Sequence, residues 1–113
     1  MKFTNSIKKR GTIKYILNNC KYNSSKNITI YVQNNYKKEN FIAICVSKKN
    51  GGSVARNKLK RWIREIYKYE EFKTKKGLNI IFLLKKNTTI ENITYELIYS
   101  QIKEAFREID IYE

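Results

Sequence analysis

Alternating and continuous apolar segments predict three strands in this chain. Residues 28–33 alternate strictly between apolar and polar or aromatic side chains, which is typical of a half-buried strand. Residues 41–47 and 78–84 are apolar on both faces, as in the central strands of a covered sheet. The polar residues 34–40 connect the first two strands and are consistent with a hairpin turn. The face expected to be buried in the first strand carries Ile28, Ile30 and Val32.

Apolar residues recur at helical spacing in three other segments. Thr12 is a candidate N-cap for a short helix that ends near Asn19, and Thr94 is one for a last helix that ends near Ile109. Between them, residues 54–69 place an apolar arc beside a positively charged stripe. The arc comprises Leu59, Trp62, Ile63 and Ile66, and we expect Trp62 to lie in the core.

The resulting element order is α-β-β-α-β-α, which fits an α/β (α+β) two-layer sandwich. The central β-α-β unit implies two parallel strands with a crossover helix, and we expect one sheet with helices packed on one face. With 113 residues, the chain is long enough for one domain, and no linker or repeat divides it. Residues 1–10 are predicted to form a basic N-terminal arm, and residues 20–27 a polar turn.

Charge changes this picture more than any other property of the composition. The chain has 24 Lys and Arg against 10 Asp and Glu, a net charge of +14. Residues 1–40 carry net +8, residues 41–69 carry net +7 and residues 70–113 carry net −1. Such a one-sided excess opposes compaction and is typical of proteins with an anionic partner. Nucleic acid is the first candidate, an anionic membrane surface is the second, and general solubility is the plain alternative.

Missing residue types exclude several kinds of site. Without any histidine, a usual zinc site, a histidine general base and a Ser-His-Asp triad are all incomplete. Cys20 and Cys45 lack metal-ligand spacing, and Cys45 is predicted to be a small buried apolar residue. We find no secretory signal and no membrane-length apolar segment, so we expect a cytoplasmic protein that does not bind a membrane. We expect no metal ligands in the chain, no catalytic residue of its own and no organic cofactor.

Residues 46–65 are the most informative segment. They read as a strand end, a glycine turn, a helix N-terminus and a basic helix, in which Glu65 is the only acid beside seven cations. Free backbone N–H groups at residues 52–55 favour a phosphate, and Asn57 can both donate and accept hydrogen bonds. Arginine binds phosphate through two parallel hydrogen bonds, whereas lysine acts as a point charge. The plain alternative is a solvated helix face, although such faces usually mix charges of both signs.

On these residues the chain resembles the bacterial ribonuclease P protein subunit. That family has a Ser-Lys-Lys strand end, a glycine loop, then Arg-Asn-Arg, an aliphatic residue and Lys-Arg before a further Arg. The chain matches at residues 47–49, Gly51, residues 56–61 and Arg64. Lys58 replaces the second Arg of Arg-Asn-Arg, which keeps the charge but loses the planar fork. The basic opening of the chain and the order of its elements are similar as well.

The resemblance implies a role in removing 5′ leaders from precursor tRNA. It implies that one protein binds one catalytic RNA, that Mg²⁺ held mainly by this RNA carries the chemistry, and that the β-α-β crossover is left-handed. The residues expected to contact the catalytic RNA are Lys48, Lys49, Arg56, Asn57, Lys58, Lys60, Arg61, Arg64 and Lys68. The expected leader cleft comprises Ile13, Leu17, Tyr31, Cys45 and Ser47, and the N-terminal arm adds Lys8, Lys9 and Arg10.

Other interpretations of these residues stay open at this point. Ile13 and Leu17, where many family members have Phe, fit a cleft wall or a core, and Tyr31 fits a base-stacking platform or an ordinary strand position. The chain could instead be a non-enzymatic RNA-binding protein of the ribosomal or RNA-chaperone kind. A membrane-surface module would require the apolar arc of residues 54–69 to face lipid.

Overall fold

A five-stranded sheet with the strand order β1-β4-β5-β3-β2 forms the centre of the molecule. The computed structural model describes all residues, 1–113, and no helix in it is both long and apolar enough to cross a bilayer. The strands are β1 (Thr4–Ser6), β2 (Lys21–Ser24), β3 (Ile28–Asn34), β4 (Asn40–Cys45) and β5 (Leu78–Leu84). The helices are α1 (Arg10–Asn19), α2 (Ser53–Glu70) and α3 (Tyr95–Glu108), with short 3₁₀ turns η1 (Lys48–Asn50) and η2 (Glu71–Lys73).

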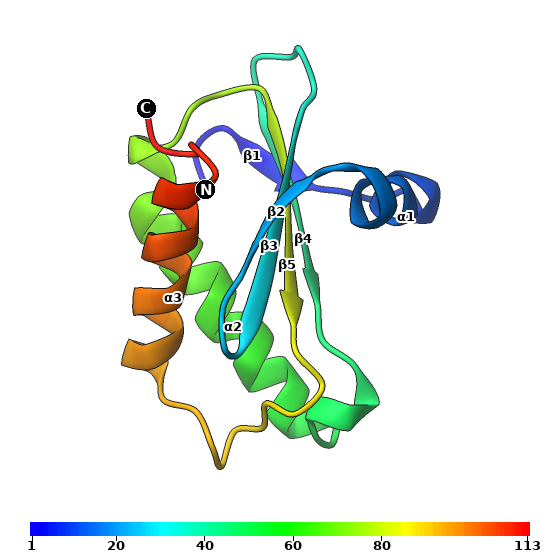
Figure 1. The fold of residues 1–113 in the computed structure, drawn as a ribbon, viewed down its shortest axis with the longest axis vertical. Coiled ribbons are helices and arrows are strands. Elements are labelled where there is room, and N and C mark those ends of the chain that lie inside the picture. The colour runs from blue at the N-terminus through cyan, green and yellow to red at the C-terminus, as the bar shows by residue number, and fades with distance from the viewer.

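The predicted α+β sandwich is confirmed, and Figure 1 shows how its layers lie. Helices α2 and α3 cover one face of the sheet, and α1 lies on the opposite face. The expectation that helices pack on one face therefore holds for α2 and α3 and not for α1. Strands β4 and β5 pair in parallel and are joined through α2, as the predicted β-α-β unit requires.

The main core fills the space between the sheet and the helices α2 and α3. Ile28 and Ile30 of β3 are fully buried there and Val32 packs against this core, as predicted for one face of the strand, but Thr29 on the other face is buried as well. Tyr67 of α2, Phe82 of β5 and Phe106 of α3 pack against one another at its centre, with ring centroids 6.0–6.4 Å apart. Burying each such side chain contributes roughly 1.5–3 kcal/mol.

Trp62 departs from its predicted place in the core. It is only half-buried and packs at the rim, edge-on against Tyr95 with 5.9 Å between the ring centroids. The Lys58 ammonium group lies 5.6 Å from the centre of the indole ring. The apolar arc of α2 therefore faces the core through its other members, and Trp62 covers the edge of the seam between α2 and α3.

Two short polar strands were missed by the sequence analysis. Residues 1–10 do not form a free arm, because β1 pairs in parallel with β4. Residues 20–27 are not only a turn, because β2 pairs antiparallel with β3. The hairpin predicted between β3 and β4 is also wrong, since β5 lies between these two strands.

The helix caps agree with the prediction at one of two positions. The Thr94 side chain accepts a hydrogen bond from the Leu97 backbone N–H at 3.1 Å and caps α3 as expected. Thr12 does not cap α1, because this helix already begins at Arg10 with Lys9 as its N-cap residue and no side-chain cap. The first turn of α1 therefore presents uncapped N–H groups.

Two fully buried asparagines fasten the segments flanking β4 to the two ends of β5. Asn40 accepts a hydrogen bond from the Leu78 N–H at 2.9 Å and donates one to the Lys75 carbonyl at 2.9 Å. Asn50 donates to the carbonyls of Lys85 at 2.8 Å and Thr88 at 2.7 Å. Together they fix where β4 begins and where the basic loop lies, which is the loop after β4 that carries Lys48 and Lys49.

Glu71 holds the N-terminal strand in place. Its carboxylate accepts hydrogen bonds from the backbone N–H groups of Lys2 (2.7 Å) and Phe3 (3.1 Å) and from the Thr4 hydroxyl (2.6 Å). Burial alone would raise the pKa of Glu71, but these hydrogen bonds to the charged form outweigh it and lower the pKa. The ionised carboxylate is thus part of the folded structure.

We predict that Glu71→Gln lowers the free energy of unfolding at neutral pH and flattens its pH dependence. A lowered folded-state pKa gives stability that is complete above the ordinary value of 4.5 and is lost as the pH falls through the folded-state value. Urea unfolding across the acid range checks this. Equal slopes for the two proteins below about pH 5 would contradict the role assigned to Glu71.

Candidate nucleic-acid interface

The sheet face that carries α1 is largely free of other elements. Side chains alternate along a strand, so residues paired across neighbouring strands share a row on one face. The middle row of this open face contains Ala43, Ile81, Tyr31 and Tyr22. Ile81 and Ile16 of α1 are both fully buried although neither belongs to the main core, so α1 seals only the centre of this face.

The basic segment begins in a rigid turn directly after β4. Ser47 caps η1, because its hydroxyl accepts a hydrogen bond from the Lys49 N–H at 3.3 Å. Gly51 follows with φ of 131°, a conformation that favours glycine, and an added Cβ there would lie 3.1 Å from the Ala55 Cβ. The turn thus leads the chain from the sheet into α2 within a few residues.

The N-terminus of α2 has no protein group to satisfy it. Gly52 is the N-cap residue and offers no side-chain cap, and the first turn contains no acid. The backbone N–H groups of residues 53–55 precede the first N–H bonded within the helix, that of Arg56. A phosphate oxygen is well suited to this position because the helix dipole also favours an anion.

The basic residues of this region are free of acidic partners. The two ion pairs of the protein are Lys73 with Glu70 and Lys75 with Asp110, and both lie elsewhere. Arg56, Lys60, Arg64 and Lys68 repeat every four residues along α2 and so share one side of the helix. Arg56 and Lys60 are half-buried, whereas Arg64 and Lys68 are exposed, as are the remaining members of the predicted RNA-binding set: Lys48, Lys49, Asn57, Lys58 and Arg61. The Arg56 Nε is buried without any hydrogen-bond partner in the protein.

A small hollow of about 240 Å³ joins this basic helix to the open face. We call it the apolar hollow. Ile13 of α1 and Cys45 of β4 line it together with the cations Lys60 and Arg64. Burial raises the pKa of the Cys45 thiol, while the positive charge of Lys60 opposes that rise. The apolar hollow therefore brings two of the predicted cleft residues together with two of the predicted RNA-binding residues.

The other three predicted cleft residues, Leu17, Tyr31 and Ser47, do not line this hollow. Leu17 is half-buried one helical turn after Ile13, and Ser47 is exposed at the cap of η1. Tyr31 is half-buried and packs against Tyr22 of β2, with ring centroids 5.4 Å apart and planes tilted by 39°. Tyr22 is not among the predicted cleft residues, because the sequence pattern did not predict β2. The alternating Tyr22 and Ser24 before a polar turn were the available signal.

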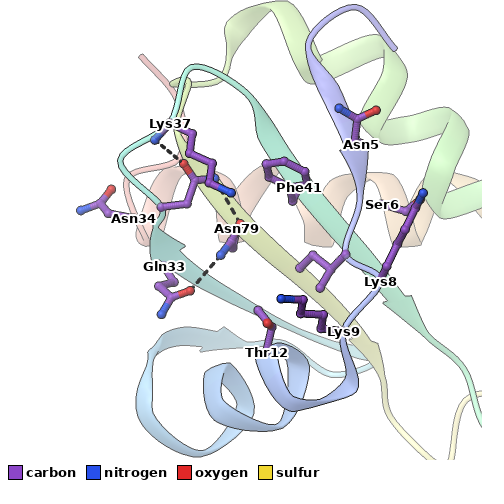
Figure 2. A pocket seen from close by; sticks show the side chains of 12 residues that line it. Asn5, Ser6, Lys8, Lys9, Thr12, Gln33, Asn34, Lys37, Phe41 and Asn79 are labelled. Carbon is purple, nitrogen blue, oxygen red and sulfur yellow. Dashed lines mark hydrogen bonds between the residues drawn. The ribbon is translucent and has the colours of Figure 1, made fainter.

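The basic residues Lys8, Lys9 and Arg10, at and just before the start of α1, divide between two surfaces. Lys8 and Lys9 line a larger hollow on the open face, shown in Figure 2. Arg10 lines a shallow groove along α1 together with Ile13 and Leu17. All three are exposed.

A protein-bound Mg²⁺ does not fit the residues at the interface. Glu65 is the one acid on α2 between Ser53 and Tyr69, and no group of three or more His, Cys, Asp or Glu side chains in the chain could hold a metal ion. The surface is built to contact anions, since its free groups are ammonium, guanidinium and backbone N–H donors.

Comparison with known proteins agrees with this geometry. The model of the family described as Ribonuclease P matches residues 1–110. The ribonuclease P protein component of Alkaliphilus metalliredigens is 31% identical over 111 residues, which is 98% of each chain. The chain belongs to the ribonuclease P protein family. The protein component of Finegoldia magna is 36% identical over 87 residues, 77% of this chain and 73% of that one.

Solved ribonuclease P proteins share the fold as well. The Staphylococcus aureus protein superposes with a TM-score of 0.84 at 25% identity, covering 96% of this chain and 97% of that one. As a ribonuclease P protein component, the chain is a subunit of the ribonuclease P endoribonuclease, acts in tRNA 5′ processing and partners an RNA subunit. The resemblance drawn from residues 46–65 is thereby confirmed.

We predict opposite effects for two glycine substitutions. Gly51→Ala should lower the free energy of unfolding by about 1–3 kcal/mol, because alanine rarely adopts this backbone conformation. Gly11→Ala, in the first turn of α1 with no atom near its Cβ position, should raise it by up to about 1 kcal/mol. Urea unfolding of both variants checks this, and two equal effects would contradict the strain assigned to Gly51.

Proposed function

We propose that the chain binds the catalytic RNA of ribonuclease P through the basic side of α2 and holds the 5′ leader of precursor tRNA on the open sheet face. Mg²⁺ bound by the RNA would supply the hydrolysis, and the protein would contribute no catalytic group. The observation that carries the proposal is the row of cations on α2 without a single ion pair, leading into the apolar hollow.

Each part of the basic segment has a distinct task in this proposal. The N-terminus of α2 receives one phosphate through its free N–H groups. Arg56 supplies a guanidinium whose buried Nε gains an acceptor when a phosphate oxygen approaches. Lys60 and Arg64 lie at the rim of the apolar hollow, where they face the catalytic RNA on one side and the leader on the other.

The leader would cross from this rim onto the open face. The apolar walls at Ile13 and Cys45 suit an unstacked base, and the Tyr22–Tyr31 pair offers an aromatic surface on the same face. Base stacking on aromatic side chains tolerates any sequence, as leaders of different tRNAs require. The protein thus favours leader-bearing precursors over mature tRNA by adding contacts that only the precursor can make.

Reconstitution tests the proposal against the non-enzymatic alternative. One protein should bind one catalytic RNA and stimulate cleavage of precursor tRNA at low Mg²⁺, in keeping with a cytoplasmic role in tRNA maturation. A general RNA-binding protein would bind both RNAs without stimulating cleavage or preferring a leader. Absence of stimulation over the RNA alone would sink the proposal.

We predict that Arg64→Ala weakens binding to the catalytic RNA and reduces its salt dependence. One lost phosphate contact should lower the slope of log K against log salt by about one unit. Arg107→Ala is the matched control, because it removes the same charge from an exposed position on α3 that is outside the predicted RNA-binding set. Filter binding over a salt series measures both, and identical slopes for all three proteins would remove Arg64 from the phosphate-binding side.

We predict that Tyr31→Ala reduces affinity for precursor tRNA and leaves affinity for the catalytic RNA unchanged. The expected loss is about 1–3 kcal/mol for one stacked base. Tyr69→Ala, which removes an exposed ring from α2, serves as the control. Titration of the holoenzyme with precursor and with leaderless tRNA gives the readout. A loss that is equal for both ligands would contradict the assignment of Tyr31 to the leader.

A further inference from the structure

The connection between β3 and β4 carries the most exposed aromatic side chain of the protein. Tyr36 is 92% exposed, and its backbone lies in the left-handed region with φ of 59°. Glycine, asparagine and aspartate adopt that conformation readily, whereas a bulky side chain strains the backbone there. A solvated ring on a strained backbone adds little to the stability of the fold, and this combination points to a role outside it.

This connection, residues 35–39, is firmly held, and we call it the tyrosine loop. The Asn35 side chain accepts a hydrogen bond from the Lys37 N–H at 2.7 Å and donates one to the Glu39 carbonyl at 3.1 Å. The Asn35 N–H donates to the Gly77 carbonyl at 2.8 Å. Gly77 has φ of 85°, and an added Cβ there would lie 2.7 Å from the Lys37 carbonyl oxygen. The backbone that carries Tyr36 therefore projects from a fixed base just before β5.

Three lysines without acidic partners lie in or beneath the tyrosine loop. Lys37 and Lys38 belong to the loop, and Lys76 lies in the segment beneath it. All three are exposed, and none forms an ion pair. The one acid of the loop, Glu39, accepts a hydrogen bond from the Asn5 side chain at 2.6 Å. This end of the molecule thus offers an aromatic ring among free positive charges, which suits a stacked base with phosphates on either side.

These lysines continue the row of cations on α2. Lys68 is the last cation of that row, and Glu71, three residues further on, lies on the same side of the chain. Glu71 binds the Lys2 N–H at 2.7 Å and so brings the N-terminal segment to the end of the row. The Lys76 ammonium group lies 5.0 Å from the centre of the Phe3 ring. Unpaired cations therefore extend from the start of α2 through Lys2 and Lys76 to the tyrosine loop.

The length of this line of charge indicates the kind of partner. Figure 1 shows the tyrosine loop and the start of α2 toward opposite ends of the longest axis, which measures 38 Å. A partner that follows the line must be long, stiff and anionic along its whole length, as an RNA stem is. The loops and bulges of such stems carry unpaired bases, which stack on aromatic side chains. An acidic protein segment would match the lysines and leave the ring without a purpose.

We propose that the tyrosine loop is a second contact of the protein with the catalytic RNA, in which an unpaired base stacks on Tyr36 and the neighbouring phosphates bind Lys38 and Lys76. The proposal rests on the proposed function, in which the basic side of α2 binds this RNA, and it extends that interface to the other end of the protein. One contact at α2 leaves the protein free to pivot on the RNA. A second contact at the far end fixes its direction, and with it the placement of the open face.

Two substitutions at one position separate the ring from the fold. Tyr36→Asn removes the ring and suits the left-handed backbone, so it should raise the unfolding temperature while weakening binding of the catalytic RNA about tenfold. Tyr36→Phe keeps the ring and should restore the affinity. Filter binding of the catalytic RNA transcribed in vitro, together with thermal unfolding of each protein, measures both effects. Unchanged affinity of Tyr36→Asn would overturn the proposal.

A pair of lysine variants tests the charge in the same assay. Lys38→Ala should lower the slope of log K against log salt by about one unit, because one phosphate contact is lost. Lys26→Ala is the matched control, because Lys26 is equally exposed and lies in the turn between β2 and β3, outside the line of charge. The control should keep the slope of the original chain. Equal slopes for the two variants would contradict a phosphate contact at the tyrosine loop.

Titration of the assembled holoenzyme with precursor tRNA identifies which RNA the loop contacts. If Tyr36→Asn weakens binding of the precursor and not of the catalytic RNA, the loop contacts the substrate and the proposal is wrong. If Arg64→Ala weakens binding of the catalytic RNA and Tyr36→Asn does not, only the second contact is refuted. If the original chain itself does not bind the catalytic RNA, the failure lies in the proposed function.

Discussion

The buried side-chain amides of Asn40 and Asn50 fix the parallel strands β4 and β5 relative to each other, and the position of the basic helix α2 depends on this pair of strands. Parallel strands such as β4 and β5 cannot be joined by a tight turn, so their relative position depends on what fixes their ends. Asn40 bonds the start of β4 to the start of β5, and Asn50 bonds the loop after β4 to the chain after β5. Because both amides are fully buried, losing either would leave backbone groups unsatisfied in the interior. The basic loop is consequently as firmly placed as the sheet.

This rigid frame permits an unusual separation of surfaces. One sheet face is covered by α2 and α3 and supplies most of the core, so the other face needs only α1 to seal its centre. The remainder of that face is free to carry hollows, aromatic rings and amides. The cations of α2 stand at the junction of the two sides and repel one another in the free protein. An anionic partner relieves that repulsion, which explains why so one-sided a charge is tolerated.

The sequence correctly predicted the elements that depend on the local pattern of apolar, polar and capping residues. The strands at residues 28–33 and 78–84, the last helix with its Thr94 cap, and the basic helix were all visible in periodicity and capping chemistry. The errors share a physical cause. The edge strands β1 and β2 are polar and short, and β1 is anchored by Glu71, distant in the sequence, which binds the backbone just before β1 and the Thr4 hydroxyl. The placement of β5 between β3 and β4, the position of Trp62 at the rim and the larger hollow on the open face likewise depend on contacts between segments that are distant in the sequence.

The two polar strands that escaped detection also determine how the sheet ends. Each sheet border exposes unpaired backbone groups onto which another chain could add a strand. Here one border is β1, only three residues long, and the other is β2, four residues long and beginning with a lysine. Such brief, hydrophilic borders give an incoming strand little to pair with, and the positive charge of the chain repels a second copy. The apolar strands β4 and β5 are thus paired on both sides and leave no free edge onto which another chain could add a strand.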